Sequence, residues 1–163
     1  MRTILRAAGF AIVLSILFGI HAVAQEKIAG AWKISEFTMY FDFGKTVAFT
    51  GTQPGMVLFT KTRFSMLAVV GDKPRPDFDR ANATDAQKVA AWTPFIALAG
   101  TYERKGATLI FHDEVSKDPY DMKPGLFYRI DYKLEAHTLV LSVKANQDGP
   151  IPNPMVIRLT RLE

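Results

Sequence analysis

The chain has 163 residues, no cysteine, and 20 Lys and Arg against 16 Asp and Glu. This length suits one domain with a hydrophobic core of its own. The absence of cysteine excludes disulfides, thiolate catalysis and cysteine-ligated zinc. The excess of positive charge is small and no stripe of Lys and Arg is visible, so we expect no nucleic-acid partner.

The first 24 residues have the pattern of a secretory signal peptide. Two arginines precede an apolar run over residues 7–23, and the small residues at 22 and 24 fit a cleavage site. The run is a little short for a membrane-spanning helix, which needs about 20 residues. We therefore predict a signal peptide at 1–24, a mature domain at 25–163 and a periplasmic or secreted location. No stable membrane span is expected after cleavage.

The stretch from Gly100 to Val115 predicts a β-hairpin at the centre of this domain. Aromatic and β-branched residues dominate both halves, which argues against a helix. The two halves meet at Lys105-Gly106, where Gly106 can supply the positive φ that a tight turn needs.

Similar strands are predicted on both sides of this hairpin. Before it lie apolar or alternating runs at 30–35, 55–60 and 64–70, and after it at 126–134, 138–144 and 155–162. The alternation is cleanest in 126–134, where Tyr128, Ile130, Tyr132 and Leu134 share one face. Residues 40–52 are compatible with a loop or a short strand pair, whereas 71–82, 116–125 and 147–154 predict loops.

One helix interrupts the strands. Thr84 to Gln87 is a capping-box signature with Thr84 as the N-cap. An apolar stripe follows at helical spacing: Val89, Trp92, Ile96 and Ala99. We expect Pro94 to kink or split this helix and Gly100 to end it. Trp92 is expected to pack against the strands or, alternatively, to form part of a lid over a pocket.

These elements predict an all-β fold, an antiparallel up-and-down barrel of about eight strands with one inserted helix. Closure is favoured because it removes the exposed edges of such a sheet. A barrel of eight strands has an interior that holds side chains or one small ligand. The predicted fold is therefore the basis on which a function can be predicted.

Several motifs follow one another in a characteristic order. They are Gly30-x-Trp32, the strand GMVLF at 55–59, the inserted helix, Gly100-Thr101-Tyr102, the strand bearing His112, and a last strand ending in Arg161. In this order the chain resembles the lipocalin-like domain proteins of bacteria over most of 29–163. The resemblance implies a calycin-type barrel whose closed end is formed by Gly30 and by Trp32 beneath Arg161. The inserted helix departs from ordinary lipocalins, which carry their helix after the barrel.

His112 and Glu114 are the candidates for acid–base chemistry. Alternation gives two sets, one with Ile110, His112 and Glu114, the other with Leu109, Phe111, Asp113 and Val115. If the first set faces inward, an imidazole and a carboxylate share the interior and could transfer protons. If the second set does, His112 lies outside. The residues leave both arrangements open.

No metal site and no cofactor are predicted. The acidic residues at 113, 114, 118 and 121 fit no calcium-binding loop, so a solvated loop is the expected structure.

Three functions are compatible with these features. The first, implied by the resemblance, is binding of a small hydrophobic or amphipathic molecule inside the barrel. The predicted ligand-contacting side chains are Phe59, Phe64, Met66, Tyr102, Tyr128, Ile130 and Tyr132. The second is an isomerase or cyclase acting on a lipid-like substrate, with His112 and Glu114 or a tyrosine as proton carriers. The third is a non-catalytic structural or interaction protein of the cell envelope with a solid barrel.

Overall fold

The structure is a computed structural model that describes residues 28–41, 45–50 and 53–163. The signal peptide predicted at 1–24 lies outside the described residues.

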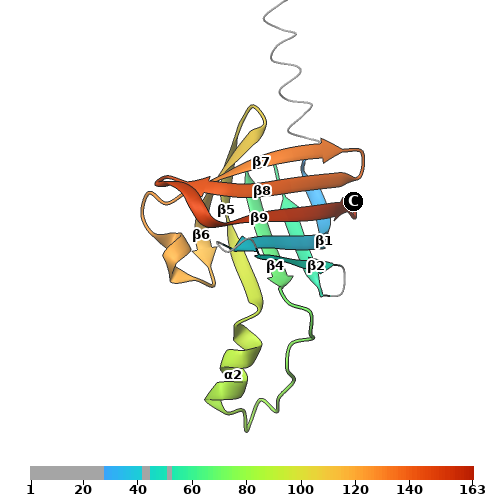
Figure 1. Cartoon of the computed structure of the whole chain (residues 1–163), viewed down its shortest axis with the longest axis vertical. Helices are drawn as coiled ribbons and strands as arrows, with labels where there is room; N and C mark the ends of the chain where they lie inside the picture. The colour runs from blue at the N-terminus through green and yellow to red at the C-terminus, as the bar shows by residue number, and fades with distance from the viewer. Residues whose placement is uncertain (1–27, 42–44, 51–52) are drawn as a thin grey trace, which may run out of the picture.

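The described residues contain one antiparallel sheet of nine strands (Figure 1). The strands are β1 (Gly30–Phe41), β2 (Lys45–Thr50), β3 (Gly55–Phe59), β4 (Arg63–Val69), β5 (Phe95–Lys105), β6 (Thr108–Ser116), β7 (Tyr128–Glu135), β8 (Thr138–Asn146) and β9 (Gly149–Arg161). β1 pairs with both β3 and β9, which closes eight of the strands into a barrel. The predicted antiparallel barrel is thus confirmed.

β2 is the ninth strand, and it pairs with the second half of β1, from Glu36 to Phe41. The first half of β1, from Gly30 to Lys33, pairs with β3 instead. The stretch that was compatible with a loop or a strand pair therefore forms a hairpin with β1.

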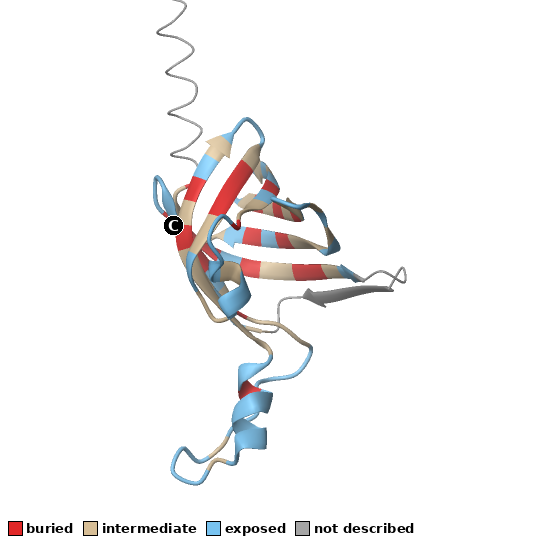
Figure 2. Cartoon of the chain, turned by 90° about the vertical axis from the view of Figure 1, so that its left-hand side faces the viewer, coloured by how far each residue is buried: buried red, intermediate tan, exposed pale blue. Residues whose placement is uncertain are grey.

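Side chains that alternate along the strands fill the barrel interior. The burial pattern is clearest in β8 and β9, where Leu139, Leu141 and Val143 face Ile157 and Leu159, all of them buried. Figure 2 shows these buried positions as separate bands along the barrel strands. Burying one such side chain stabilises the fold by about 1.5–3 kcal/mol.

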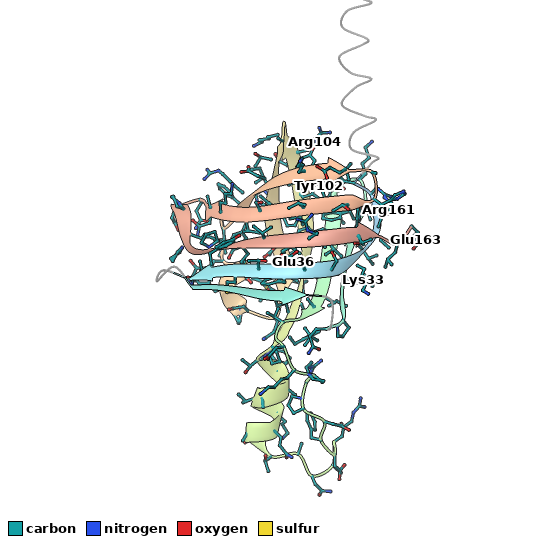
Figure 3. All side chains as sticks on the ribbon, turned by 45° about the vertical axis from the view of Figure 1, so that its right-hand side comes forward. Lys33, Glu36, Tyr102, Arg104, Arg161 and Glu163 are labelled. Atoms are coloured by element: carbon teal, nitrogen blue, oxygen red, sulfur yellow. The ribbon has the colours of Figure 1, made fainter. Side chains whose placement is uncertain are left out.

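Trp32 and Arg161 form the contact that the resemblance implies. Trp32 is fully buried, and its Nε1 donates a hydrogen bond to the Ile28 carbonyl at 2.8 Å. The Arg161 guanidinium lies 4.4 Å from the centre of the indole. Figure 3 shows Arg161 near Glu163, at the end of the barrel. Gly30 has a φ of +132°, and a Cβ there would lie 2.4 Å from the Glu163 carbonyl oxygen. Glycine at position 30 therefore allows the start of β1 to lie against residue 163, just after the end of β9.

The helix begins where the sequence predicts and ends earlier. α2 spans Asp85–Trp92, and both bonds of the capping box between Thr84 and Gln87 are present. Residues 95–99, expected to continue the helix past Pro94, belong to β5 and pair with β4. The prediction that the helix continues past Pro94 was wrong, because pairing with the edge of β4 outweighs the helical spacing of the apolar residues.

α2 projects away from the barrel (Figures 1 and 2). Trp92 is 56% exposed and does not pack into the barrel wall, so the first predicted role is wrong. Its ring lies 5.3 Å from the Lys117 ammonium, and a role in a lid stays a prediction. No helix in the described part of the chain has the length and apolar character needed to cross a membrane.

The proline-rich segment predicted as a loop over 147–154 is mostly strand. β9 starts at Gly149, directly after a two-residue turn from β8. Its register against β8 shifts between the pairs Ala145–Pro150 and Val143–Met155. Prolines at 150, 152 and 154 lack the N–H that a regular ladder needs, which accounts for the irregularity.

Candidate ligand-binding site

A cavity of about 300 Å³ lies inside the barrel, toward the end from which α2 and the short 3₁₀ helix η1 (Pro119–Met122) project. Neither Trp32 nor Arg161 lines it. Its wall is mostly apolar and comes from strands around the barrel, including Phe37, Val57, Phe64, Met66, Phe111, Ile130, Leu141 and Ile157. The interior is therefore only partly filled by its own side chains.

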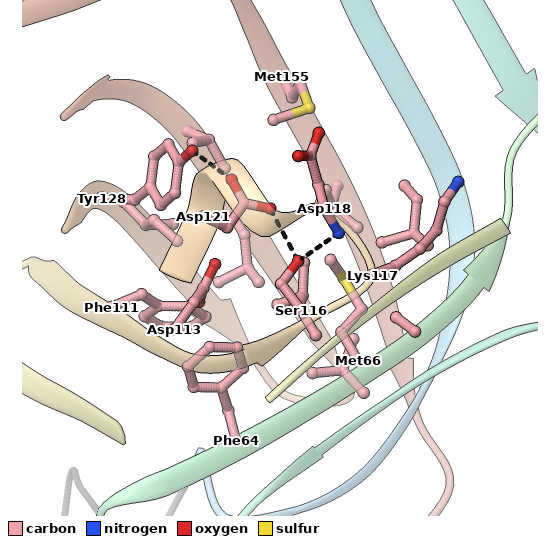
Figure 4. A pocket seen from close by; sticks show the side chains of 18 of the residues that line it. Phe64, Met66, Phe111, Asp113, Ser116, Lys117, Asp118, Asp121, Tyr128 and Met155 are labelled. Carbon is pink, nitrogen blue, oxygen red and sulfur yellow. Dashed lines mark hydrogen bonds between the residues drawn. The ribbon is translucent and has the colours of Figure 1, made fainter. Parts of the chain in front are cut away.

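Polar side chains gather on one side of this cavity (Figure 4). Asp121 of η1 accepts hydrogen bonds from the Tyr128 hydroxyl at 2.8 Å and from Ser116 Oγ at 2.9 Å. Both of its carboxylate oxygens thus accept a hydrogen bond from a hydroxyl group. Burial, together with the bond to Asp121, raises the pKa of Tyr128 far above its ordinary value, so this hydroxyl remains a donor.

Asp113 reaches the cavity through the alternation of β6, which places it on the inner face with Leu109 and Phe111. A bulge follows in the β5–β6 ladder, where Gly100 pairs with Asp113 and Ala99 with Val115, which leaves Glu114 as the extra residue. Beyond the bulge the alternation changes phase, and Val115 is 66% exposed. The solvated-loop interpretation of the acidic residues was wrong for Asp113 and Asp121, which are half-buried and line the cavity.

The carboxyl group of Asp113 is poorly accommodated as an anion. Its Oδ1 is buried and has no hydrogen-bond partner among the described residues. Burial, and secondly the negative charge of Asp121, raise the pKa of Asp113 to about 7. At neutral pH the group is therefore divided between its acid and carboxylate forms.

We expect Asp113→Asn to stabilise the protein at pH 8 by about 1–3 kcal/mol and to leave stability nearly unchanged at pH 4. A raised pKa means that the folded state holds the proton more tightly than the unfolded chain. Stability from this group is present below pH 4 and is lost as the pH rises through about 7. Urea unfolding at both pH values measures the difference.

Asp72→Asn, at an exposed loop position, is the control and is expected to change stability equally little at both pH values. An Asp113→Asn effect that did not depend on pH would contradict the assignment.

The structure places four of the seven predicted ligand-contacting residues at the cavity, namely Phe64, Met66, Tyr128 and Ile130. The other three lie elsewhere in the barrel. Phe59 and Tyr102 are buried against each other, with ring centres 5.5 Å apart, and the Tyr102 hydroxyl donates to the Thr60 carbonyl. Tyr132 lies beneath the Arg104 guanidinium, 5.5 Å from it. These three side chains pack the barrel rather than line its open space.

His112 and Glu114 do not meet in the interior. His112 lies on the outer face beside Phe127, with ring centres 5.9 Å apart. Glu114 is exposed and accepts a hydrogen bond from Arg63 at 2.7 Å. Neither side chain lines the cavity. The inward arrangement that acid–base chemistry by this pair would need is absent.

No group of three or more His, Asp or Glu side chains is placed to hold a metal ion in the part of the chain that the structure describes. The polar groups of the cavity are carboxyl, hydroxyl and ammonium groups, which suits recognition of a polar group on an organic molecule.

Comparisons with known proteins agree with the architecture. A family model described as a lipocalin-like domain matches residues 29–160, from just before β1 almost to the end of β9. No curated protein matches the chain. The crystal structure of a lipocalin-like protein from Bacteroides uniformis is similar, with 14% identity and a TM-score of 0.43. The match covers 83% of this chain and 99% of that one. The family match spans nearly the whole barrel, and the chain therefore belongs to the lipocalin-like domain family.

Proposed function

We propose that this protein binds a small hydrophobic or amphipathic molecule in the barrel cavity, and that it does so in the periplasm or outside the cell. The observation that carries the proposal is the cavity itself, about 300 Å³ of space behind a mainly apolar wall. Sites for small molecules are concave and mostly apolar, with volumes of about 300–1,000 Å³. The signal-peptide pattern at 1–24 supports the location.

The arrangement of polar groups favours an amphipathic ligand over a purely apolar one. Met66, Leu141 and Ile157 offer contact for an apolar body, while Asp113 and Asp121 lie where a polar group would bind. A purely apolar ligand would leave the buried oxygen of Asp113 without a partner, which is unfavourable.

The alternatives gain less support. A solid barrel, as a purely structural role would allow, does not account for the open space. An enzyme using His112 and Glu114 would need both side chains in the cavity, and they lie outside it.

We expect Met66→Trp to weaken binding of a neutral apolar probe such as N-phenyl-1-naphthylamine by about tenfold or more. Met66 lines the cavity, and an indole in its place would occupy part of the space that the probe needs. Fluorescence titration of the probe measures the dissociation constants of variant and wild type.

Leu67→Trp is the matched control, since Leu67 is the next residue of β4 and is 46% exposed. Its affinity should stay within about twofold of wild type. The proposal fails if folded wild-type protein does not bind the probe at micromolar concentration, or if both substitutions weaken binding equally.

A further inference from the structure

Acidic side chains outnumber basic ones around the cavity, which favours some amphipathic ligands over others. Among the described residues, three carboxyl groups line it, those of Asp113, Asp118 and Asp121, against a single basic side chain, Lys117. The Lys117 ammonium is held by three backbone carbonyls, at 2.8 Å from Trp92, 3.1 Å from Thr93 and 2.7 Å from Phe95. These hydrogen bonds hold the ammonium at the segment that joins α2 to β5. Negative side chains therefore predominate on the polar side of the cavity.

The two inner carboxyl groups differ in what they still need. Asp121 has a donor on each oxygen, from Tyr128 and Ser116. Asp113 has a buried Oδ1 that no described residue satisfies. In Figure 4 the Asp113 carboxyl lies beside the rings of Phe64 and Phe111 and on the same side of the cavity as Asp121. A group that donates hydrogen bonds and carries positive charge would satisfy both residues.

We propose that the ligand is an alkyl or arylalkyl amine, whose ammonium group binds at Asp113 and Asp121 while its apolar part fills the cavity. This inference rests on the proposed function and narrows it to one class of molecule. The neighbouring Phe64 and Phe111 rings are compatible with a cation, because aromatic faces attract positive charge. A fatty acid, in contrast, would bring its carboxylate against Asp121.

The proposal links binding to pH. An ammonium favours the ionised form of Asp113, so it competes with the proton that this group holds below about pH 7. Asp121 from η1 and Tyr128 from β7 interact electrostatically with Asp113. Ser116 at the end of β6, and Lys117 and Asp118 directly after it, line the same cavity. β4 and β5 present apolar side chains such as Met66 and Leu98. Affinity for an amine should therefore rise with pH through about 7.

The test compares octylammonium, 1-octanol and octanoate, which share one chain and differ in their head groups. Each displaces N-phenyl-1-naphthylamine from the purified protein at pH 8. We expect the affinity for octylammonium to exceed that for octanol by about tenfold or more, and the affinity for octanoate to be lower than that for octanol. The octylammonium affinity should rise about tenfold between pH 5.5 and 8.5, while that of octanol stays constant.

Asp113→Asn removes the charge with little change of shape and should reduce octylammonium affinity about tenfold, leaving octanol within about twofold. Asp72→Asn, on an exposed loop, should change neither. The order of affinities of the wild-type protein for the three compounds, and its dependence on pH, require no variant. These measurements therefore test the amine assignment even if Asp113→Asn misfolds. Equal binding of octanol and octylammonium would overturn the amine assignment and leave the proposed function intact. Failure of all three compounds and of the probe to bind would overturn both.

Discussion

Trp32→Ala is expected to lower the free energy of unfolding by about 3–5 kcal/mol. Trp32 is fully buried, so its removal opens a large space beneath Arg161. The substitution also removes the donor to the Ile28 carbonyl and the indole face that lies 4.4 Å from the Arg161 guanidinium. A domain is stable by only about 5–15 kcal/mol, so the loss would consume much of the total. Urea unfolding followed by far-ultraviolet circular dichroism measures it.

Trp92→Ala is the matched control, the same change at an indole that is 56% exposed on α2. It should cost less than about 1 kcal/mol. If Trp32→Ala does not fold, Trp32→Phe keeps a ring in place and should give a smaller, measurable loss. Equal effects at positions 32 and 92 would contradict the role of Trp32 in closing the barrel.

Gly100→Ala is expected to destabilise the protein by about 3 kcal/mol. A Cβ at this position would lie 1.9 Å from the carbonyl oxygen of His112 on the neighbouring strand. That contact is with backbone, so β5 and β6 must move apart next to Asp113, at the bulge that follows it. Thermal unfolding gives the loss of stability, and ligand titration shows whether the cavity changes with it.

Gly106→Ala separates this clash from ordinary backbone strain. Gly106 has a φ of +64° in the β5–β6 turn, and a Cβ there would contact nothing within 4 Å. Its replacement should cost about 1 kcal/mol for the left-handed conformation alone. If the two substitutions had the same cost, the close approach at Gly100 would not be the cause.

The barrel could be predicted from the sequence because the patterns that indicate its strands and turns are local and periodic. Tyr128, Ile130, Tyr132 and Leu134 alternate with charged residues, and the structure places all four on the inner, more buried side of β7. Gly106 likewise marks its turn through the positive φ that the structure shows. Period and turn chemistry depend on neighbouring residues, and both are visible in one sequence.

The errors arose where a distant partner decided the outcome. Val89, Trp92, Ile96 and Ala99 have helical spacing, yet only the first two lie in α2, because β4 supplies an edge for residues 95–99. The prolines at the start of β9 are tolerated since its register against β8 is interrupted there. Neither β4's free edge nor that interruption can be recognised from local composition.

The candidate site was predicted in part. Phe64, Met66, Tyr128 and Ile130 follow from alternation, whereas Asp113 was assigned to a solvated loop. A signal for Asp113 was present, since it shares a face with Leu109 and Phe111 in the unbroken pattern. The bulge at Glu114, which ends that pattern, arises from the pairing of β5 with β6. The size of the cavity depends on how all the walls pack and has no local signature.

The pairing of β1 with β9 has a consequence for how the protein is made. Trp32 is paired with Arg161 and Met39 with Met155, so β1 finds one of its partners in β9, which is synthesised long after it. Loop closure over such a separation is slow compared with local hairpin formation. A nascent chain therefore carries β1 with one side unpaired until β9 has been synthesised, and during that interval it depends on whatever keeps unfinished chains from associating.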